Sequence, residues 1–224
     1  GKNIGDSGHG THVAGTVAAV SNNGVGVSGI AGGTGRNDGV KLMSCQIFSG
    51  GEGGSAAVSA EAIKYAADNG ASILQCSWGY PAGAVTTDNA YASGARIEKQ
   101  AIDYFIATKN NAVLDGGLVI FAAGNDAKAM SGYPGAYRDY ISVTAFSPDY
   151  LPAYYTNYGP GCNVAAPGGD AYISPSGSSA AQVLSTLPSE LYQSDYGYMQ
   201  GTSMACPHVS GVAALGLSYA LAKG

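Results

Sequence analysis

Short apolar runs alternate along the chain with segments whose apolar residues recur at helical spacing. Runs of about six residues, apolar at consecutive positions, are typical of strands buried on both faces of a sheet. Their alternation with helices predicts an α/β fold with a mostly parallel sheet. Predicted strands cover residues 40–48, 71–77, 118–123, 140–145 and 162–166, and predicted helices cover residues 10–21, 57–69, 95–109 and 205–222.

The composition fits a compact globular core. A length of 224 residues favours one domain, and charged residues make up only 11% of the chain, against about 25% in average globular domains. The formal net charge of −5 makes nucleic acid and anionic membrane surfaces poor partners. No uninterrupted apolar run reaches the ~18 residues of a membrane-spanning helix, so we predict no membrane span.

The first candidate for chemistry lies near the end of the chain. Residues 201–203 read Gly-Thr-Ser and lead directly into the small-residue helix predicted over 205–222. The hydroxyl of Ser203 therefore lies close to a helix N-terminus, where backbone N–H groups favour negative charge. That setting suits a nucleophile whose attack on a carbonyl creates an oxyanion. The alternative is an ordinary N-cap, since Ser and Thr are common there.

A histidine near the start of the chain supplies the matching base. His9 lies between two glycines, and we expect Ser7 to cap a helix that has His9 in its first turn. A serine hydroxyl is a weak nucleophile until a general base takes its proton, and histidine is the usual base. Such partners need proximity in space and not in sequence.

A third segment offers an oxyanion donor. The apolar run 118–123 ends in Gly124-Asn125, so the Asn125 amide can point toward a developing oxyanion. The alternative is a turn that ends a buried strand, which is common for Gly-Asn pairs.

These three segments, residues 8–15, 122–125 and 201–209, resemble the histidine, oxyanion and serine motifs of subtilisin-like serine endopeptidases, the subtilases. Weaker similarity extends over residues 73–79, 133–137 and 163–168. The resemblance implies a three-layer fold, with a mostly parallel sheet and helices on both faces. It also implies polypeptide substrates, an extracellular or cell-surface location, and roles for Ser203 as nucleophile, His9 as general base and Asn125 as oxyanion donor.

One part of the family pattern is missing. The family's catalytic aspartate belongs to a strand well before the histidine motif, and Asp6 is too close to His9 to be that residue. We therefore expect residues 1–224 to form a single, partial catalytic domain that is inactive alone and needs an N-terminal segment of the same protease. The alternative is a catalytically incomplete module with a binding or structural role. A Ser–His esterase is disfavoured because the Gly-x-Ser-x-Gly motif is absent.

The resemblance also implies a binding groove and a structural ion. An extended peptide would lie between two backbone segments, Glu52-Gly53-Gly54 and Ser77-Trp78-Gly79, with Gly124 in the primary pocket. We expect apolar or aromatic side chains there, with some preference for basic groups from Glu52. Catalysis needs no cofactor. The loop 21–27 resembles the family's calcium loop, with an ordinary glycine-rich loop as the alternative; the matching ligands are the Asn23 side chain and the carbonyls of Val25 and Val27.

Other residues have structural interpretations. His9 and His12 could together hold a metal, but the resemblance gives His12 a structural role. The cysteines lack metal-site spacing and are predicted to be free, buried thiols, with Cys206 as a minor alternative nucleophile. Two stretches, residues 80–111 and 170–198, look inserted relative to the family, and loops of this kind often set substrate choice. The four cysteines are Cys45, Cys76, Cys162 and Cys206.

Overall fold

The sheet is parallel, as predicted. The computed structural model describes residues 7–49, 54–173 and 179–223. Its main sheet has four strands in the order β1-β2-β3-β4, and all neighbouring strands are parallel. Four of the five predicted strands are therefore confirmed. They are β1 (Ile73–Cys76), β2 (Leu118–Ala122), β3 (Ile141–Phe146) and β4 (Val164–Pro167).

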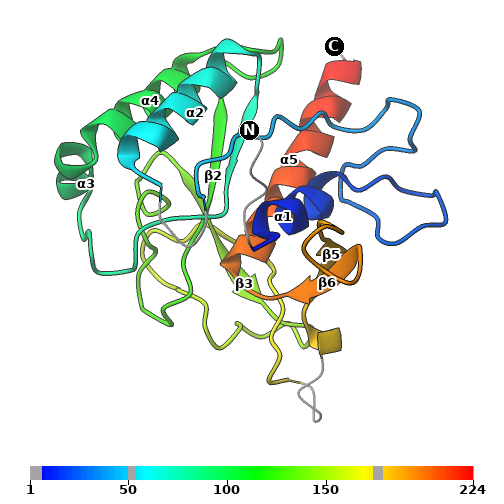
Figure 1. Ribbon diagram of the computed structural model, residues 1–224. Helices are drawn as coiled ribbons and strands as arrows, with labels where there is room; N and C mark the ends of the chain where they lie inside the picture. Colours follow the sequence, from blue (N-terminus) through cyan, green and yellow to red (C-terminus); the bar gives the residue numbers. More distant parts are fainter. Residues whose placement is uncertain (1–6, 50–53, 174–178, 224) are drawn as a thin grey trace.

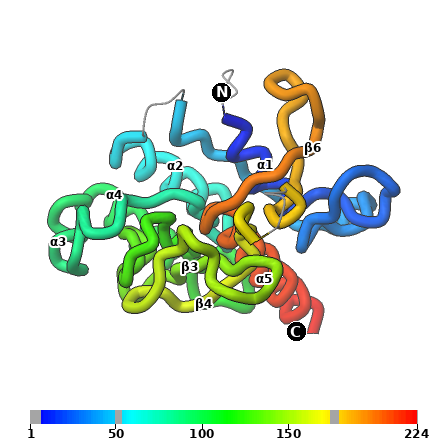
Figure 2. The backbone as a smooth tube through the Cα atoms, turned by 90° about the horizontal axis from the view of Figure 1, so that it is seen from below, coloured from blue at the N-terminus to red at the C-terminus, as the bar shows by residue number. Residues whose placement is uncertain are grey.

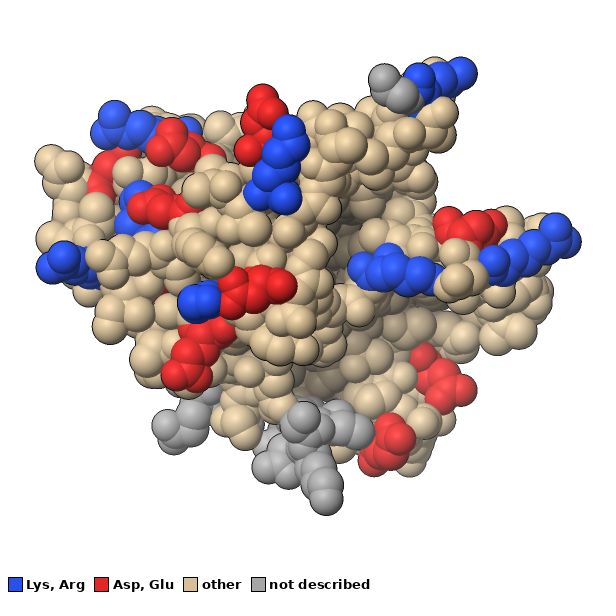
Figure 3. Space-filling model, turned by 90° about the horizontal axis from the view of Figure 1, so that it is seen from above, with Lys and Arg blue, Asp and Glu red and all other residues tan. Residues whose placement is uncertain are grey.

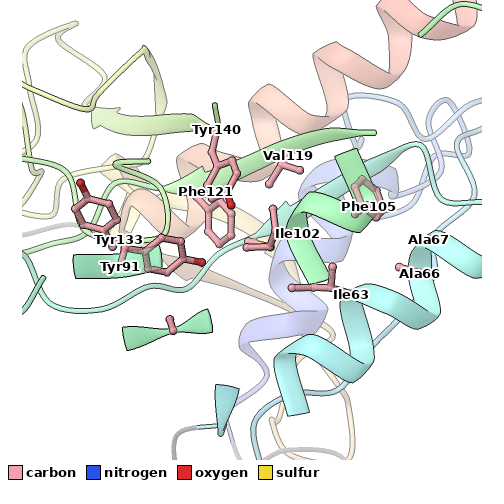
Figure 4. Packing of buried hydrophobic residues seen from close by; sticks show 12 residues of the cluster. Ile63, Ala66, Ala67, Tyr91, Ile102, Phe105, Val119, Phe121, Tyr133 and Tyr140 are labelled. Atoms are coloured by element: carbon pink, nitrogen blue, oxygen red, sulfur yellow. The ribbon is translucent and has the colours of Figure 1, made fainter. Parts of the chain in front are cut away.

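Side chains of β2 alternate between two cores because successive residues of a strand point to opposite faces. Val119 and Phe121 pack with α2 (Ala56–Asp68) and α4 (Arg96–Ala107) (Figure 4). Ile120 and Ala122 pack on the other face, against the N-terminal half of α5 (Thr202–Lys223).

The helices form a layer on each side of the sheet. α2 and α4 pack against each other, and α1 (His9–Ala18) packs on α5. Figures 1 and 2 show the resulting three layers, with α2 and α4 on one side and α5 and α1 on the other. The chain therefore has the three-layer α/β fold expected from the sequence.

Helix boundaries differ from the prediction in ways that affect the site. α5 begins three residues earlier than predicted, so Ser203 lies inside its first turn. α1 begins at His9, and its N-cap is Gly8 in the left-handed region (φ 60°) with no side-chain cap. Ser7 is not the N-cap; its Oγ only accepts a long hydrogen bond, 3.4 Å, from the N–H of His9. The short helix α3 (Asp88–Gly94) was not predicted, although Thr87 caps it through the N–H of Ala90.

The predicted strand over residues 40–48 does not form. This segment has no regular structure, and Leu42, Met43 and Phe48 are exposed. An extended apolar segment becomes a strand only when another strand offers hydrogen bonds to it. In the described part of the chain, β1 is an edge strand and residues 40–48 do not pair with it.

A small hairpin lies within the region predicted as an insertion. β5 (Val183–Thr186) pairs antiparallel with β6 (Tyr196–Met199), after the 3₁₀ turn η1 (Ser179–Ala181). The hairpin covers α1, and Gly15 of α1 is needed there because a Cβ would lie 2.2 Å from the Thr186 hydroxyl.

α5 is long and apolar enough to cross a membrane by length and composition alone. Its N-terminal half, however, is buried against the sheet and includes Ser203. The core helix of a globular domain has the same properties, so α5 is interpreted as a core helix.

Candidate active site

A cavity of about 310 Å³ opens where the carboxyl ends of β1 and β2 meet the N-terminus of α5. Ligands of open parallel sheets bind at this edge of the strands. The cavity brings together five of the residues predicted from the sequence, from three separate segments. The predicted residues that line it are Trp78, Gly79, Gly124, Asn125 and Ser203.

Ser203 lies half-buried at the cavity wall in the first turn of α5. Its Oγ donates a hydrogen bond of 3.2 Å to the carbonyl of Ser77, and the Ser77 hydroxyl donates one of 2.7 Å to the carbonyl of Ser203. These reciprocal bonds fix the start of α5 to the end of β1. Ser77, a predicted substrate-binding residue, is thus a direct neighbour of the nucleophile candidate.

Asn125 is oriented by the residue before Ser203. Its Oδ1 accepts hydrogen bonds from the backbone N–H of Thr202 (2.9 Å) and from the Thr202 hydroxyl (2.8 Å). With Oδ1 held this way, the Nδ2 donor makes no hydrogen bond to any residue that the structure describes, and Asn125 is one of the residues that line the cavity. An amide held by its oxygen beside a serine at a helix N-terminus can donate to an anion formed there.

A buried asparagine, Asn157, holds the loop that carries Asn125. The side chain of Asn157 accepts from the N–H groups of Asp126 and Lys128 and donates to the carbonyl of Ala123. Gly124 has a φ of +103°, and a Cβ there would lie 2.4 Å from the Asn157 amide. The position therefore requires glycine.

A buried carboxylate, that of Glu98, holds the part of the cavity wall formed by Tyr80. Glu98 of α4 accepts hydrogen bonds from the hydroxyls of Ser59, Tyr80 and Tyr91, and Tyr80 lines the cavity. Burial raises the pKa of the Glu98 carboxyl above its ordinary value, although the three hydrogen bonds by themselves would lower it. Glu98 thus ties three helices to the segment that follows β1.

His9 is half-buried at the start of α1 and does not line the cavity. Within the described part of the chain it makes no hydrogen bond to Ser203, although α1 and α5 pack together. Burial lowers the pKa of His9 below 6.5, and no carboxylate among the described residues raises it. A neutral imidazole suits a general base, but the pairing of His9 with Ser203 stays a prediction.

His12 has the structural environment expected for it. It is fully buried, and its Nε2 lies 3.0 Å from the carbonyl of Val183 and 3.2 Å from that of Gly197, so it connects α1 to the hairpin. Burial lowers the pKa of His12, although the two carbonyl hydrogen bonds oppose this shift; nearby His9 and His208 add smaller effects that lower the pKa. In the described residues no group of three His, Cys, Asp or Glu side chains is arranged to hold a metal.

The remaining predicted substrate residues are only partly described. Glu52 and Gly53 lie outside the described residues. Gly54 is exposed, and a Cβ on it would lie 2.2 Å from the carbonyl of Ile47. Trp78 packs edge-to-face on Phe121, 5.2 Å between ring centroids, so it borders both the cavity and the core.

The predicted calcium loop offers few ligands by itself. The Oδ1 of Asn23 accepts a hydrogen bond of 3.0 Å from the N–H of Val25, which closes a small turn. Calcium takes six to eight oxygens, whereas Asn23, Val25 and Val27 offer three. These residues alone therefore do not fit a calcium ion, and further ligands would have to come from elsewhere.

The cysteine thiols are free, and none of them lines the cavity. Cys206 is fully buried, and burial raises its pKa to about 11, which disfavours it as a nucleophile. Cys76 is buried as predicted, whereas Cys45 and Cys162 are only half-buried. Cys45 differs from the prediction because its strand does not form.

Several residues of the site were missed by sequence analysis. Thr202 directly precedes Ser203 in the serine motif, so the sequence placed it next to the site, although its role in holding Asn125 was not predicted. Asn157 had no local signal, since Asn157-Tyr158-Gly159 reads as a turn. Asp126 also lines the cavity, and it accepts hydrogen bonds from the N–H of Ala82 (3.1 Å) and the Asn157 amide (3.2 Å).

Comparisons with known proteins show the family of this chain. The model of the subtilase family matches residues 2–223. Halolysin from Haloferax mediterranei is 36% identical over 215 residues, which are 96% of this chain and 34% of that protein. Alkaline elastase YaB from Bacillus sp. (strain YaB) is 35% identical over 214 residues, 95% of this chain and 46% of that protein.

Solved structures give the same result. A structure described as proteases from Pseudoalteromonas arctica PAMC 21717 superposes with a TM-score of 0.72 at 34% identity, covering 92% of this chain and 57% of that one. The chain spans under half the length of the two curated relatives above. The motifs, the fold and these similarities together establish that the chain belongs to the subtilase family of serine proteases.

Proposed function

We propose that this chain carries most of the catalytic machinery of a serine endopeptidase. Ser203 attacks the scissile carbonyl, and His9 takes the proton from its hydroxyl and returns it to the leaving amine. Asn125 Nδ2 and the backbone N–H of Ser203 hold the oxyanion. The observation that carries the proposal is the amide of Asn125, which Thr202 orients at the cavity that Ser203 lines.

The acid that orients His9 is proposed to come from a segment outside the described residues. In the described chain the pKa of His9 responds to burial alone, so nothing there stabilises an imidazolium. Three features support the binding of such a segment. Among the described residues, β1 has a free edge and residues 40–48 pair with no strand, and Figure 3 shows a hollow between the lobe of α2 and α4 and the rest of the molecule. A strand carrying the aspartate would pair with β1 and cover apolar side chains.

The substrate is proposed to be an extended polypeptide whose side chain before the scissile bond enters the cavity. Trp78 and Pro81 make the cavity wall partly apolar, which favours apolar or aromatic side chains. Charges on the face seen in Figure 3 are mixed in sign, which does not favour nucleic acid. An extracellular or cell-surface location is proposed from the family alone.

One observation favours a second candidate, a subtilase-fold module with a binding role. Ser203 Oγ donates to the Ser77 carbonyl, and the described residues contain no His9–Ser203 hydrogen bond. A module of this kind would bind peptides in the cavity without cleaving them.

Labelling of Ser203 separates the two candidates. The full-length protein and its Ser203→Ala variant are treated with a fluorophosphonate, which reacts with activated serines, and the labelled peptide is identified by mass spectrometry. Labelling at Ser203 together with hydrolysis of a peptide anilide supports the endopeptidase. An unlabelled Ser203 in a protein that still binds peptide supports the binding module.

A further inference from the structure

Two exposed tyrosines pack against each other outside the cavity. Tyr154 and Tyr172 lie edge-to-face with their ring centroids 4.7 Å apart, yet they are 53% and 76% exposed. Large aromatic side chains gain free energy from burial and usually find it in the core. A pair that is held together but left open to solvent is typical of a surface that binds another aromatic or apolar group.

A buried carboxylate holds the backbone of both tyrosines. Asp170 is only 4% exposed, and its two oxygens accept hydrogen bonds from the N–H of Tyr154 (3.0 Å) and the N–H of Tyr172 (2.9 Å). One side chain thus fixes two segments that lie 16 residues apart in the sequence. A backbone that is held in advance loses little conformational entropy when a ligand binds.

Gln200 connects the pair to the active site. Its Oε1 accepts from the N–H of Ala171 (2.7 Å), and its Nε2 donates to the hydroxyl of Tyr154 (3.2 Å). Ser203 follows Gln200 by three residues, so their Cα atoms are at most about 11 Å apart. An extended peptide advances about 3.3 Å per residue, so a substrate cut at Ser203 reaches the tyrosines within a few residues.

The position of the pair indicates which part of the substrate it meets. The residues before the scissile bond are assigned to the cavity and to the backbone at Ser77-Trp78-Gly79. None of Tyr154, Tyr172 and Gln200 lines that cavity. The residues that follow the scissile bond have no surface assigned to them, and the link through Gln200 to the segment that carries Ser203 assigns the pair to them.

We propose that Tyr154 and Tyr172 form a subsite that binds an aromatic or large aliphatic side chain of the polypeptide substrate on the leaving-group side of the scissile bond. This inference rests on the proposed peptidase function. Tyr172 belongs to the stretch 170–198 that looks inserted relative to the family, so the subsite gives this chain a preference of its own.

Kinetics on three substrates test the subsite in the full-length protein. Two internally quenched peptides are identical up to the cut and carry either Phe or Gly at the three positions after it; the third substrate is a peptide anilide, which has no residue after the cut. The double variant Tyr154→Ala/Tyr172→Ala is expected to lose about 3- to 10-fold in kcat/KM on the Phe peptide. It should keep its activity on the Gly peptide and on the anilide.

Tyr219→Ala is the matched control, since Tyr219 is 68% exposed and lies about 24 Å along α5 from Ser203. An unchanged preference for Phe over Gly in the double variant, or an equal loss on all three substrates, would overturn the subsite.

A binding measurement separates failure of the subsite from failure of the proposed function. In the Ser203→Ala background, the Kd of the uncleaved Phe peptide should rise by a similar factor when both tyrosines are removed. If the wild-type protein cleaves nothing but this Kd still rises, the peptidase proposal fails and the binding surface stands. If the wild-type protein cleaves peptides and the Kd does not change, the subsite fails alone.

Discussion

The two sides of the active site are built differently. The serine side consists of the loops after β1, β2 and β3 with the first turn of α5, and its parts hold one another through Thr202, Asn125 and Asn157. The histidine side consists of α1, residues 19–49 and the hairpin β5–β6. There, α1 starts at an uncapped glycine, and residues 40–48 have no strand partner in the described chain.

This difference shows what each half needs in order to function. Parallel strands bring their carboxyl ends to one edge, so the serine side is complete once the sheet forms. The histidine side depends on segments far away in sequence: His12 binds carbonyls of β5 and β6, and Tyr192 donates to the carbonyl of Ser7 at 2.6 Å. We therefore expect perturbations of the histidine side to act on the position and protonation of His9.

The largest expected effect comes from completing the histidine side. These 224 residues alone should hydrolyse a peptide anilide at least about 10⁴-fold more slowly than the same chain supplied with the strand that carries the aspartate, because loss of a triad aspartate costs about that factor in a trypsin-like protease. Steady-state rates with and without the added segment measure the effect. With His9→Ala, the added segment should restore nothing.

Full activity of the isolated chain would contradict this expectation. Another acid would then have to orient His9, and Asp6, which lies outside the described residues, would be the first candidate.

On the serine side, Asn125→Ala in the full-length protein should lower kcat by about 10²–10³ with little change in KM, because the lost amide acts on the transition state. Thr202→Ala should have a smaller effect in the same direction, since the backbone N–H of Thr202 still holds Asn125. Thr202→Ser keeps the hydroxyl and is the matched control. A change confined to KM would show that Asn125 binds substrate without stabilising the oxyanion.

Tyr192→Phe tests how firmly the hairpin holds the start of α1. The Tyr192 ring packs on Gly8, and its hydroxyl bonds the carbonyl of Ser7, two residues before His9. Loss of one hydrogen bond of about 1 kcal/mol should lower kcat by about 5-fold and leave KM unchanged. Tyr196→Phe removes a hydroxyl from the same hairpin and should have no effect; equal kinetics of both variants would exclude a positioning role for Tyr192.

The three histidines, two in α1 and one in α5, should also make stability depend on pH. Burial lowers the pKa of His9, His12 and His208 below 6.5 in the folded chain, so below that pH the unfolded chain binds more protons than the folded one. The free energy of unfolding should therefore fall as the pH drops from about 6.5 toward the folded pKa values. Urea titrations at several pH values measure it.

His9→Gln supplies the comparison for this pH dependence. The variant should show a shallower fall than the wild type, because one titrating group is removed. Glu98 acts in the opposite direction, since its raised pKa favours the folded chain at low pH; the difference between wild type and variant isolates the histidine. Identical slopes would contradict a lowered pKa of His9.

The smallest effect is proposed for calcium at the loop 21–27. If further oxygen ligands complete the site in the full-length protein, a chelator should lower its Tm by a few degrees through loss of ligand binding to the folded state. Asn23→Ala should abolish that response. A Tm that does not respond to chelator would leave residues 21–27 as an ordinary glycine-rich loop.

Four of the five strands predicted from the sequence form, and so do the main helices, because buried parallel strands leave uninterrupted apolar runs and helices leave a 3.6-residue period. The prediction failed at residues 40–48, where the local pattern is that of a strand but no partner strand is available in the described chain. It also missed the hairpin β5–β6, whose short strands are half-exposed and give no clear alternation.

The sequence by itself determined the chemistry offered: a serine at a helix start, a histidine between glycines and an asparagine at a strand end, since each is a local pattern of residue types. Only the tertiary structure decided which of these groups meet. Thr202 orients Asn125, which lies 77 residues away in the sequence, and Asn157 holds the loop at Asp126, which lies 31 residues away. These hydrogen bonds depend on distances in space, and those distances exist only once the sheet has folded. For the same reason, the sequence alone does not indicate that Tyr154 and Tyr172 lie side by side.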